Sequence, residues 1–149
     1  MPVTVFSAAK RLAARSGWKL SHLEIQKILY LAHMVYLGKT NGAPLIKGHF
    51  EAWDFGPVHP ELYHRAKIFG SSAVQNIFQS DPDLPDGLEQ NIIDEAASKL
   101  AGLGAGRLVN ATHRSNGAWE RNYRPGERGS IIPNEDIWKE YESLTHVQA

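Results

Sequence analysis

The sequence predicts a single, mainly α-helical domain over residues 1–149, with a small β element. Three observations lead to this fold class. Helix-start signals recur along the chain, apolar residues follow them at helical spacing, and glycine or proline ends most of these stretches. Residues 39–58 differ, because turn residues there precede alternating large apolar and polar residues. We therefore expect about five to seven helices, a hairpin or short strands near residues 45–55, and a further candidate strand at 130–132.

The first two helices start at clear capping residues. Thr4 is placed to cap a helix that ends at Ser16-Gly17. Ser21 and Glu24 form a capping box, in which each side chain satisfies a backbone N–H of the other residue. The helix that follows runs to Gly38 and is apolar nearly all round. Such a helix is typical of the buried centre of a bundle.

The later helices are predicted from the same signals. Pro60 suits the first position of a helix that stops before Gly70, and Asp86 is placed to cap an amphipathic helix reaching Leu100. Asn134 is placed to cap the last helix, with Glu135 in its first turn, where the helix dipole favours a negative charge. Two shorter helices are expected at Ser72–Phe78 and Leu108–His113.

The β element is predicted around Phe50–Phe55, and Gly56-Pro57 is expected to end it. Trp53 and Phe55 are large aromatic residues in a short strand. Such a pair is more often a small satellite of the core than a binding surface. Residues of this segment are nevertheless candidates for both roles.

Composition excludes several classes of function. Sixteen basic residues balance sixteen acidic ones, so no global charge attracts nucleic acid or an anionic membrane. The chain has no cysteine, which removes disulfides, thiol catalysis and sulfur-ligated zinc. Met1–Phe6 does not resemble a secretory signal, and the apolar run Ile28–Leu37 is too short to span a bilayer. A cytoplasmic protein without membrane attachment is expected.

Metal and catalytic chemistry find little support in the residue patterns. His59 and His64 would point about 140° apart on one helix, and Pro60 stands where a metalloprotease motif has glutamate. Gly102–Gly106 follows a helix and lacks the Lys-Ser/Thr of a phosphate-binding loop, so helix termination explains it better. We expect no metal, no cofactor and no enzymatic activity.

The segment 114–130 has no helical or strand periodicity, and an irregular segment of this length is commonly functional. It contains four arginines against two glutamates, together with Trp119 and Tyr123. Tryptophan, tyrosine and arginine are enriched at the energetic centres of protein interfaces. The same residues can stack on bases and pair with phosphates. A third interpretation, in which Trp119 anchors the loop and the arginines are solvated, also stays open.

Several stretches together resemble one protein family, the Panacea domain of SocA-like antitoxins. Leu23–His33 is similar to the family's opening helix with its Leu-Gln-Lys core. Phe50–Tyr63 matches the Glu-Ala-Trp and Gly-Pro-Val-x-Pro-x-x-Tyr signature, and Leu108–His113 followed by Trp119 matches the Leu-x-x-x-Thr-His and Trp pattern. The similarity spans about residues 20–142. One departure is Ala118, where the family commonly has proline, and it bears on the pose of Trp119.

The resemblance implies an antitoxin encoded beside a toxin and acting by direct contact with that cognate toxin protein. In part of the family the domain is a proteolytic adaptor that delivers its toxin to an AAA+ protease, and other members sequester the toxin. Members also occur in prophages. A nucleic-acid-binding regulator that uses the basic segment 114–130 is the alternative, and the oligomeric state is left open. The candidate contact residues are His113, Arg114, Trp119, Arg121 and Tyr123, with Trp53 and Tyr63 as signature positions nearby.

Overall fold

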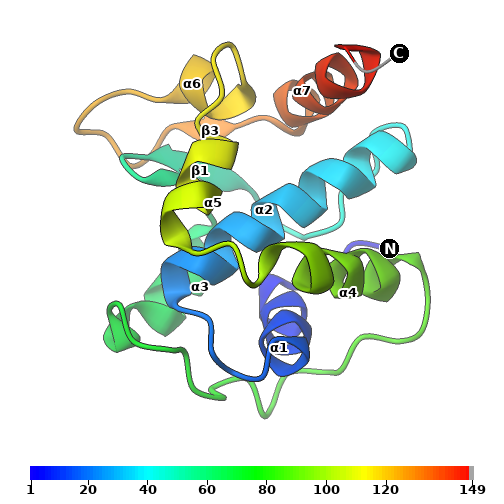
Figure 1. The fold of residues 1–149 in the computed structure, drawn as a ribbon, viewed down its shortest axis with the longest axis vertical. Helices are drawn as coiled ribbons and strands as arrows, with labels where there is room; N and C mark the ends of the chain where they lie inside the picture. Colours follow the sequence, from blue (N-terminus) through cyan, green and yellow to red (C-terminus); the bar gives the residue numbers. More distant parts are fainter. Residues whose placement is uncertain (148–149) are drawn as a thin grey trace.

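The computed structural model describes residues 1–147 and confirms a mainly helical fold with a small antiparallel sheet (Figure 1). The termini of the described chain lie on the same side of the molecule in Figure 1. The elements in chain order are α1 (Val5–Arg15), α2 (His22–Lys39), β1 (Phe50–Trp53), β2 (Gly56–Val58), α3 (Pro60–Ala66), the 3-10 turn η1 (Lys67–Phe69), α4 (Leu88–Leu100), α5 (Ala105–Thr112), α6 (Ala118–Asn122), β3 (Ile131–Ile132) and α7 (Asn134–Val147).

Helix α2 is the centre of the fold, as its all-round apolar sequence predicts. It crosses the middle of the molecule in Figure 1 and packs against α1, α4, α5, α7 and β2. The predicted capping box is present, since Ser21 Oγ accepts from Glu24 N and Glu24 Oε1 accepts from Ser21 N. Thr4 likewise caps α1 by accepting from Ser7 N. These caps fix where the two helices begin. Because α2 is buried on every side, the surrounding helices and strand β2 are arranged around it.

The three strands form one antiparallel sheet in the order β2-β1-β3. Trp53 pairs with Gly56 across the β1–β2 turn, and Phe50 pairs with Ile132 of β3. Both predicted strand regions are therefore confirmed. The expectation that Gly56-Pro57 ends the β element is wrong, because these two residues begin β2. Pro57 can lie in β2 because this strand is at the edge of the sheet and needs fewer backbone donors.

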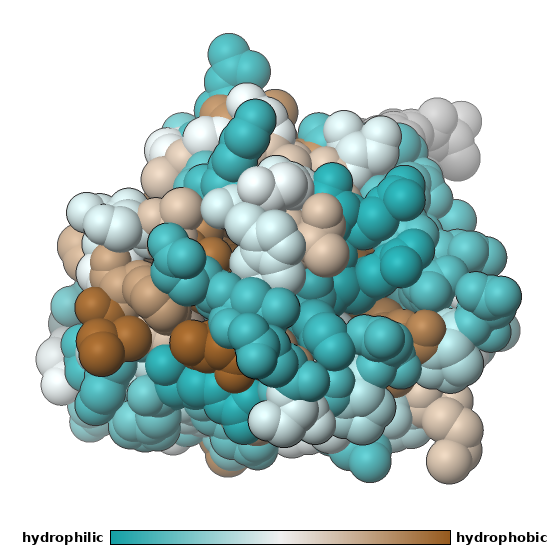
Figure 2. Space-filling model, turned by 90° about the horizontal axis from the view of Figure 1, so that it is seen from below, coloured by the Kyte–Doolittle hydropathy of each residue, from teal (hydrophilic) through white to brown (hydrophobic). Residues whose placement is uncertain are grey.

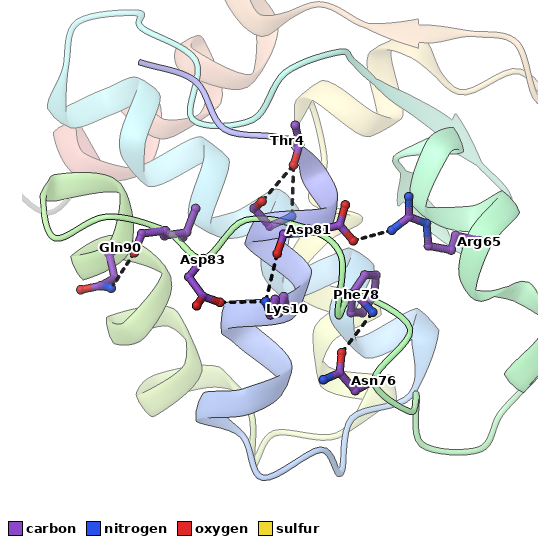
Figure 3. Close-up of polar contacts among 10 residues, drawn as sticks. Thr4, Lys10, Arg65, Asn76, Phe78, Asp81, Asp83 and Gln90 are labelled. Atoms are coloured by element: carbon purple, nitrogen blue, oxygen red, sulfur yellow. Dashed lines mark hydrogen bonds and ion pairs between the residues drawn. The ribbon is translucent and has the colours of Figure 1, made fainter.

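Residues 70–87 form a long connection that lies against α1 and α3 (Figure 3). Lys10 Nζ donates to Asp81 O at 2.9 Å and pairs with Asp83 at 2.8 Å, while Arg65 pairs with Asp81 at 2.6 Å. The helix predicted at Ser72–Phe78 is not formed. Its backbone groups are used elsewhere, since Val74 N donates to Leu20 O and Phe78 N donates to the side chain of Asn76.

Three local predictions also differ from the structure. The N-cap of α4 is Gly87 rather than Asp86, and no side chain caps it. The short helix α5 begins at Ala105, three residues before the predicted Leu108, so Gly106 lies within it. The oxygen of Asn134 accepts from His33 Nε2 at 2.9 Å, so this side chain ties α7 to α2 instead of serving as the expected cap.

The predicted irregular segment 114–130 contains a short helix, α6, between residues 118 and 122. Five residues are too few to show a periodic pattern, which is why the sequence did not reveal α6. Seen from below, the surface is mostly hydrophilic, with separate hydrophobic spots rather than one apolar field (Figure 2). Within residues 1–147, no helix is both long and apolar enough to cross a membrane.

Candidate functional site

A cavity of about 340 Å³ lies where the start of α2, the β1–β2 hairpin, α3 and residues 126–128 meet. We call it the aromatic cavity, because Trp53 and Tyr63 form its walls. Its volume suits one or two amino-acid side chains or a small ligand. The residues that line it are His22, Leu23, Gln26, Lys27, Trp53, Asp54, Phe55, Val58, Tyr63, Gly70, Gly126, Glu127 and Arg128.

Gln26 fastens the hairpin to α2 beneath this cavity. Its Oε1 accepts from the backbone N–H of His59 at 2.8 Å, and its Nε2 donates to the carbonyl of His59 at 3.2 Å. The same Nε2 donates to His22 Nε2 at 2.9 Å. The glutamine side chain thus bonds to both backbone groups of a residue 33 positions away, whose carbonyl also accepts from Tyr63 N at 3.0 Å. Both N–H donors of Gln26 are therefore used within the protein.

Lys27 lies at the floor of the cavity and is only 1% exposed. Its Nζ donates to the carbonyl of Pro57 at 2.8 Å. Burial lowers the pKa of Lys27 from 10.5 to about 7, because a charged amine loses its hydration there. Gly56 makes this packing possible. A Cβ at position 56 would lie 2.7 Å from Lys27 Cε, and the φ of +117° is one that L side chains rarely adopt.

The histidines near the hairpin are buried and neutral. Burial, followed by the charge of Lys27, lowers the pKa of His22 to about 4. Burial also lowers the pKa of His59, whose Nε2 donates to the carbonyl of Lys47 at 2.8 Å. In the described part of the chain, no three histidines or carboxylates converge as a metal site would require. These rings serve as hydrogen-bonding and packing groups around the hairpin.

Arg128 lies over the aromatic walls at the mouth of the cavity. Its guanidinium carbon is 4.3 Å from the centre of the Trp53 ring and 5.5 Å from that of Tyr63. The two aromatic rings meet edge to face at 4.6 Å. Trp53 is 9% exposed, and its indole N–H donates to Glu51 at 3.0 Å. The rings therefore hold the guanidinium in place by cation–π contact while its N–H groups stay exposed.

A stack of three rings supports the hairpin from the other side. Trp119 lies between His113, at 3.7 Å with nearly parallel rings, and Tyr123 at 4.5 Å. The indole N–H of Trp119 donates to the carbonyl of Trp53 at 2.8 Å, and Tyr123 donates to Asp54 at 2.6 Å. Trp119 itself is 8% exposed. It therefore acts mainly by holding β1 in position, and Tyr123 fixes the turn at Asp54.

The other two candidate residues lie on a different surface. Arg114 and Arg121 line a second cavity of about 430 Å³, between α6 and α7. Arg114 Nε is 4.0 Å from the buried carboxylate of Glu140, whose pKa is raised by burial. The structure therefore brings Trp53, Tyr63, His113, Trp119 and Tyr123 together around the hairpin and leaves the two arginines on the α7 side.

The departure at Ala118 has a local explanation. Ala118 is the first residue of α6, a position that readily accepts proline. In this chain its backbone N–H donates to Glu140 Oε1 at 2.7 Å. Proline has no N–H and could not make this bond. Alanine therefore gives Glu140 a partner, and the pose of Trp119 one residue later is set by its stacking and by its bond to β1.

Sequence reasoning missed several residues of the aromatic cavity, namely His22, Gln26, Lys27 and Arg128. A signal for two of them was available. Lysine and glutamine are rarely buried without partners, so Gln26 and Lys27 within an all-round apolar helix indicate buried polar contacts. Arg128 gave no comparable signal, because its stacking on Trp53 depends on the tertiary fold.

Comparison with known proteins indicates the same family as the sequence signature does. The family described as Antitoxin SocA-like, Panacea domain, matches residues 25–120. Antitoxin SocA of Caulobacter vibrioides (strain NA1000 / CB15N) is 34% identical over 123 residues, covering 72% of this chain and 62% of the relative. The chain thus matches about three fifths of that relative's length. No solved structure is significantly similar. The chain belongs to the SocA-like antitoxin family and carries its Panacea domain.

Proposed function

We propose that this protein is a cytoplasmic antitoxin that neutralises a cognate toxin by binding it directly. The observation that carries the proposal is the placement of the family signature. Trp53, Val58 and Tyr63, which belong to that signature, all line the aromatic cavity. Their arrangement beside an exposed hairpin turn supports a role in recognition and not in the core alone.

The hairpin turn provides the apolar part of the proposed interface. Phe55 is 70% exposed at the tip of the turn, next to the cavity mouth. Arg128, which is exposed, and Tyr63, which is half-buried, line the same cavity. An exposed aromatic residue beside arginine and tyrosine is the composition of an interface hot spot. Among the predicted contact residues, we propose that Tyr63 and Tyr123 lie at this interface, that Trp53, Trp119 and His113 support it, and that Arg114 and Arg121 are peripheral.

The test is co-expression with the product of the neighbouring gene. We expect rescue of growth and co-purification of the two proteins. Phe55→Ser should weaken the complex by about tenfold or more without changing the unfolding midpoint, because the side chain is exposed in the free protein. Leu88→Ser, at an exposed apolar position of α4, is the matched control. Absence of both complex and rescue would count against the proposal.

Two modes of neutralisation are compatible with this interface, and we propose that they be separated by the lifetime of the toxin. An adaptor that delivers the toxin to an AAA+ protease shortens that lifetime in cells. A sequestering antitoxin leaves it unchanged or lengthens it. A pulse–chase measurement of the toxin, with and without this protein, distinguishes the two.

Nucleic-acid binding is the second candidate function. It is favoured by Arg121, Arg124 and Arg128, which make no ion pair within residues 1–147 and are exposed. Binding through phosphates must weaken steeply as salt concentration rises. A gel shift with the protein's own promoter DNA at two salt concentrations tests it. A strong, salt-sensitive shift with no toxin complex would favour this candidate over the first.

A further inference from the structure

The guanidinium of Arg128 is held in place but has no anionic partner. It stacks on Trp53 and Tyr63, and it forms no ion pair with any described residue. A guanidinium carries five N–H donors in a fixed plane, which suits two-point binding of a carboxylate. Stacking removes much of the rotational freedom that an exposed arginine would otherwise lose on binding. Arg128 is therefore prepared to receive an anionic group.

The groups behind Arg128 are also mainly hydrogen-bond donors. Lys27 Nζ makes one hydrogen bond within the described residues, to Pro57 O, and it has at least one further N–H whether it is charged or neutral. His22 accepts from Gln26 through Nε2, so its single proton is on Nδ1. Both residues line the aromatic cavity. A ligand that enters the cavity therefore meets donors at the mouth and floor, and aromatic rings between them.

Two acidic residues also line this cavity, and neither neutralises Arg128 by contact. Asp54 accepts a hydrogen bond from Tyr123 at 2.6 Å, so it already has a donor. Glu127 is exposed and forms no ion pair with a described residue. The aromatic walls and the size of the cavity favour an apolar side chain next to the anion. A fully polar or highly charged ligand fits this arrangement less well.

We propose that the aromatic cavity binds a carboxylate attached to an apolar segment of a partner protein, with Arg128 pairing the carboxylate and Trp53 and Tyr63 packing against the apolar part. The carboxylate can belong to an Asp or Glu side chain or to the end of the partner chain. The inference rests on the proposed antitoxin function, in which the partner is the toxin, and it specifies what that toxin must present.

The test uses the full chain and three acetylated peptides. Acetyl-Leu-Phe has a free terminal carboxylate, acetyl-Leu-Phe-amide has none, and acetyl-Phe-Glu-amide has only a side-chain carboxylate. The readout is the NMR shift of the Trp53 indole N–H, with the indole of Trp138, which lies against Gly42 beyond the other end of α2, as an internal reference. We expect at least one carboxylate peptide to bind about tenfold more tightly than the amide. Which of the two binds identifies the source of the carboxylate.

Two arginines of one loop provide a matched pair of variants. Arg128→Gln should abolish the preference for carboxylate over amide, whereas Arg124→Gln, at an exposed position in the same loop, should keep it. The inference is overturned if the amide binds as tightly as both carboxylates, if Arg128→Gln keeps the preference, or if no peptide binds up to about 10 mM. Tighter binding of a thymidine trinucleotide would also overturn it, in favour of a nucleic-acid site. The peptide test uses no toxin and is therefore independent of the co-purification test. If the protein captures the toxin but binds no peptide, this inference is rejected and the proposed antitoxin function is kept.

Discussion

The two halves of the molecule use polar residues in opposite ways. In the α1–α4 half, which comprises α1, α4 and residues 71–87, charged residues form ion pairs near the surface, such as Arg11 with Asp94. In the hairpin half, which comprises the first turns of α2, the three strands, α3 and α6, polar side chains are buried and bond to the backbone. Gln26, Lys27 and His59 are its main examples. Surface ion pairs add little to stability, whereas buried polar groups are costly to disturb.

This difference indicates where the fold is specialised. The α1–α4 half could be replaced by many sequences that keep an apolar core and a charged surface. The hairpin half depends on particular side chains that bond to backbone groups far away in sequence. The bonds of Gln26 and Lys27 to backbone groups tie α2 to β2 and to the start of α3, and such buried bonds favour one arrangement of these elements. We infer that the hairpin half is built to hold the aromatic cavity and the turn at Phe55 in one fixed arrangement.

The largest effect is expected from Gln26→Leu. The substitution leaves the backbone N–H of His59 and Nε2 of His22 without a partner in a buried site, while the His59 carbonyl keeps its bond from Tyr63 N; the loss should be about 2–4 kcal/mol of unfolding free energy. Gln90→Leu is the matched control in α4, because Gln90 donates a single bond, to Leu84 O at 3.2 Å, in a partly exposed site. It should cost under about 1 kcal/mol. Equal losses in urea unfolding would contradict the distinction between the halves.

The second-largest effect is the loss of stability expected in acid, which should come mainly from His33. Its Nδ1 accepts from Ile46 N, its Nε2 donates to Asn134, and burial lowers its pKa to about 4. The unfolded chain takes up a proton near pH 6.5, before the folded protein does, so stability falls as pH drops from 6.5 to 4. The loss should reach roughly 3 kcal/mol.

Urea unfolding at several pH values measures this loss. His33→Gln, which can make both hydrogen bonds without titrating, should weaken the dependence on pH, and the part that remains comes from His22 and His59, whose pKa values are also lowered. His64→Gln, at an exposed position of α3, is the control and should leave the dependence as it is. A wild-type slope unchanged by His33→Gln would show that other groups cause the loss of stability in acid.

Lys27→Met should stabilise the fold by about 1–3 kcal/mol at neutral pH. The unfolded chain is protonated up to pH 10.5, whereas the folded pKa is about 7, so the lysine opposes folding. The opposition is complete below pH 7 and fades as pH rises to 10.5. Loss of the bond to Pro57 offsets part of the gain.

Unfolding free energies of this variant and of Lys139→Met, an exposed control on α7, test the expectation between pH 6 and pH 10. The advantage of Lys27→Met over the wild type should shrink as pH rises. A variant that is less stable than the wild type throughout this range would mean that Lys27 is needed to hold β2 in place.

The smallest effect is expected from Arg11→Leu in the α1–α4 half. Arg11 pairs with Asp94 through two bonds, of 2.8 and 2.7 Å, but both side chains are partly exposed. The loss should be no more than about 1 kcal/mol, and it should shrink in high salt because ions screen the pair. Thermal unfolding at low and high salt measures it. A loss as large as that of Gln26→Leu would remove the contrast between the halves.

Local signals were sufficient to predict much of the fold. Thr4 and Ser21 cap α1 and α2 as expected, because capping depends on residues three positions apart. The helix predicted at Ser72–Phe78 was wrong because Val74 bonds to Leu20, a distant partner that local patterns do not reveal. Helix α6 was missed because it is too short to be periodic.

The candidate site was predicted less completely than the fold. Trp53 and Tyr63 were found through the family resemblance, and they do line the aromatic cavity. Trp119 was chosen for its chemistry, but it is mostly buried against His113 and Tyr123. Arg128 was overlooked as an individual residue among four arginines of one segment. Arg128 and Trp53 are 75 positions apart in the sequence (128 − 53), so their contact depends on the tertiary fold and local patterns do not predict it.

Hydrogen exchange of the toxin-bound protein tests most directly whether the hairpin half is the interface. The protein alone and the complex would be compared, peptide by peptide, by mass spectrometry. We expect added protection in residues 53–56 and 124–130, which contain Phe55 and Arg128, and no change in α1, α4 or residues 71–87. Protection confined to α1, α4 and residues 71–87 would contradict the account, because the toxin would then bind the half that we consider structural.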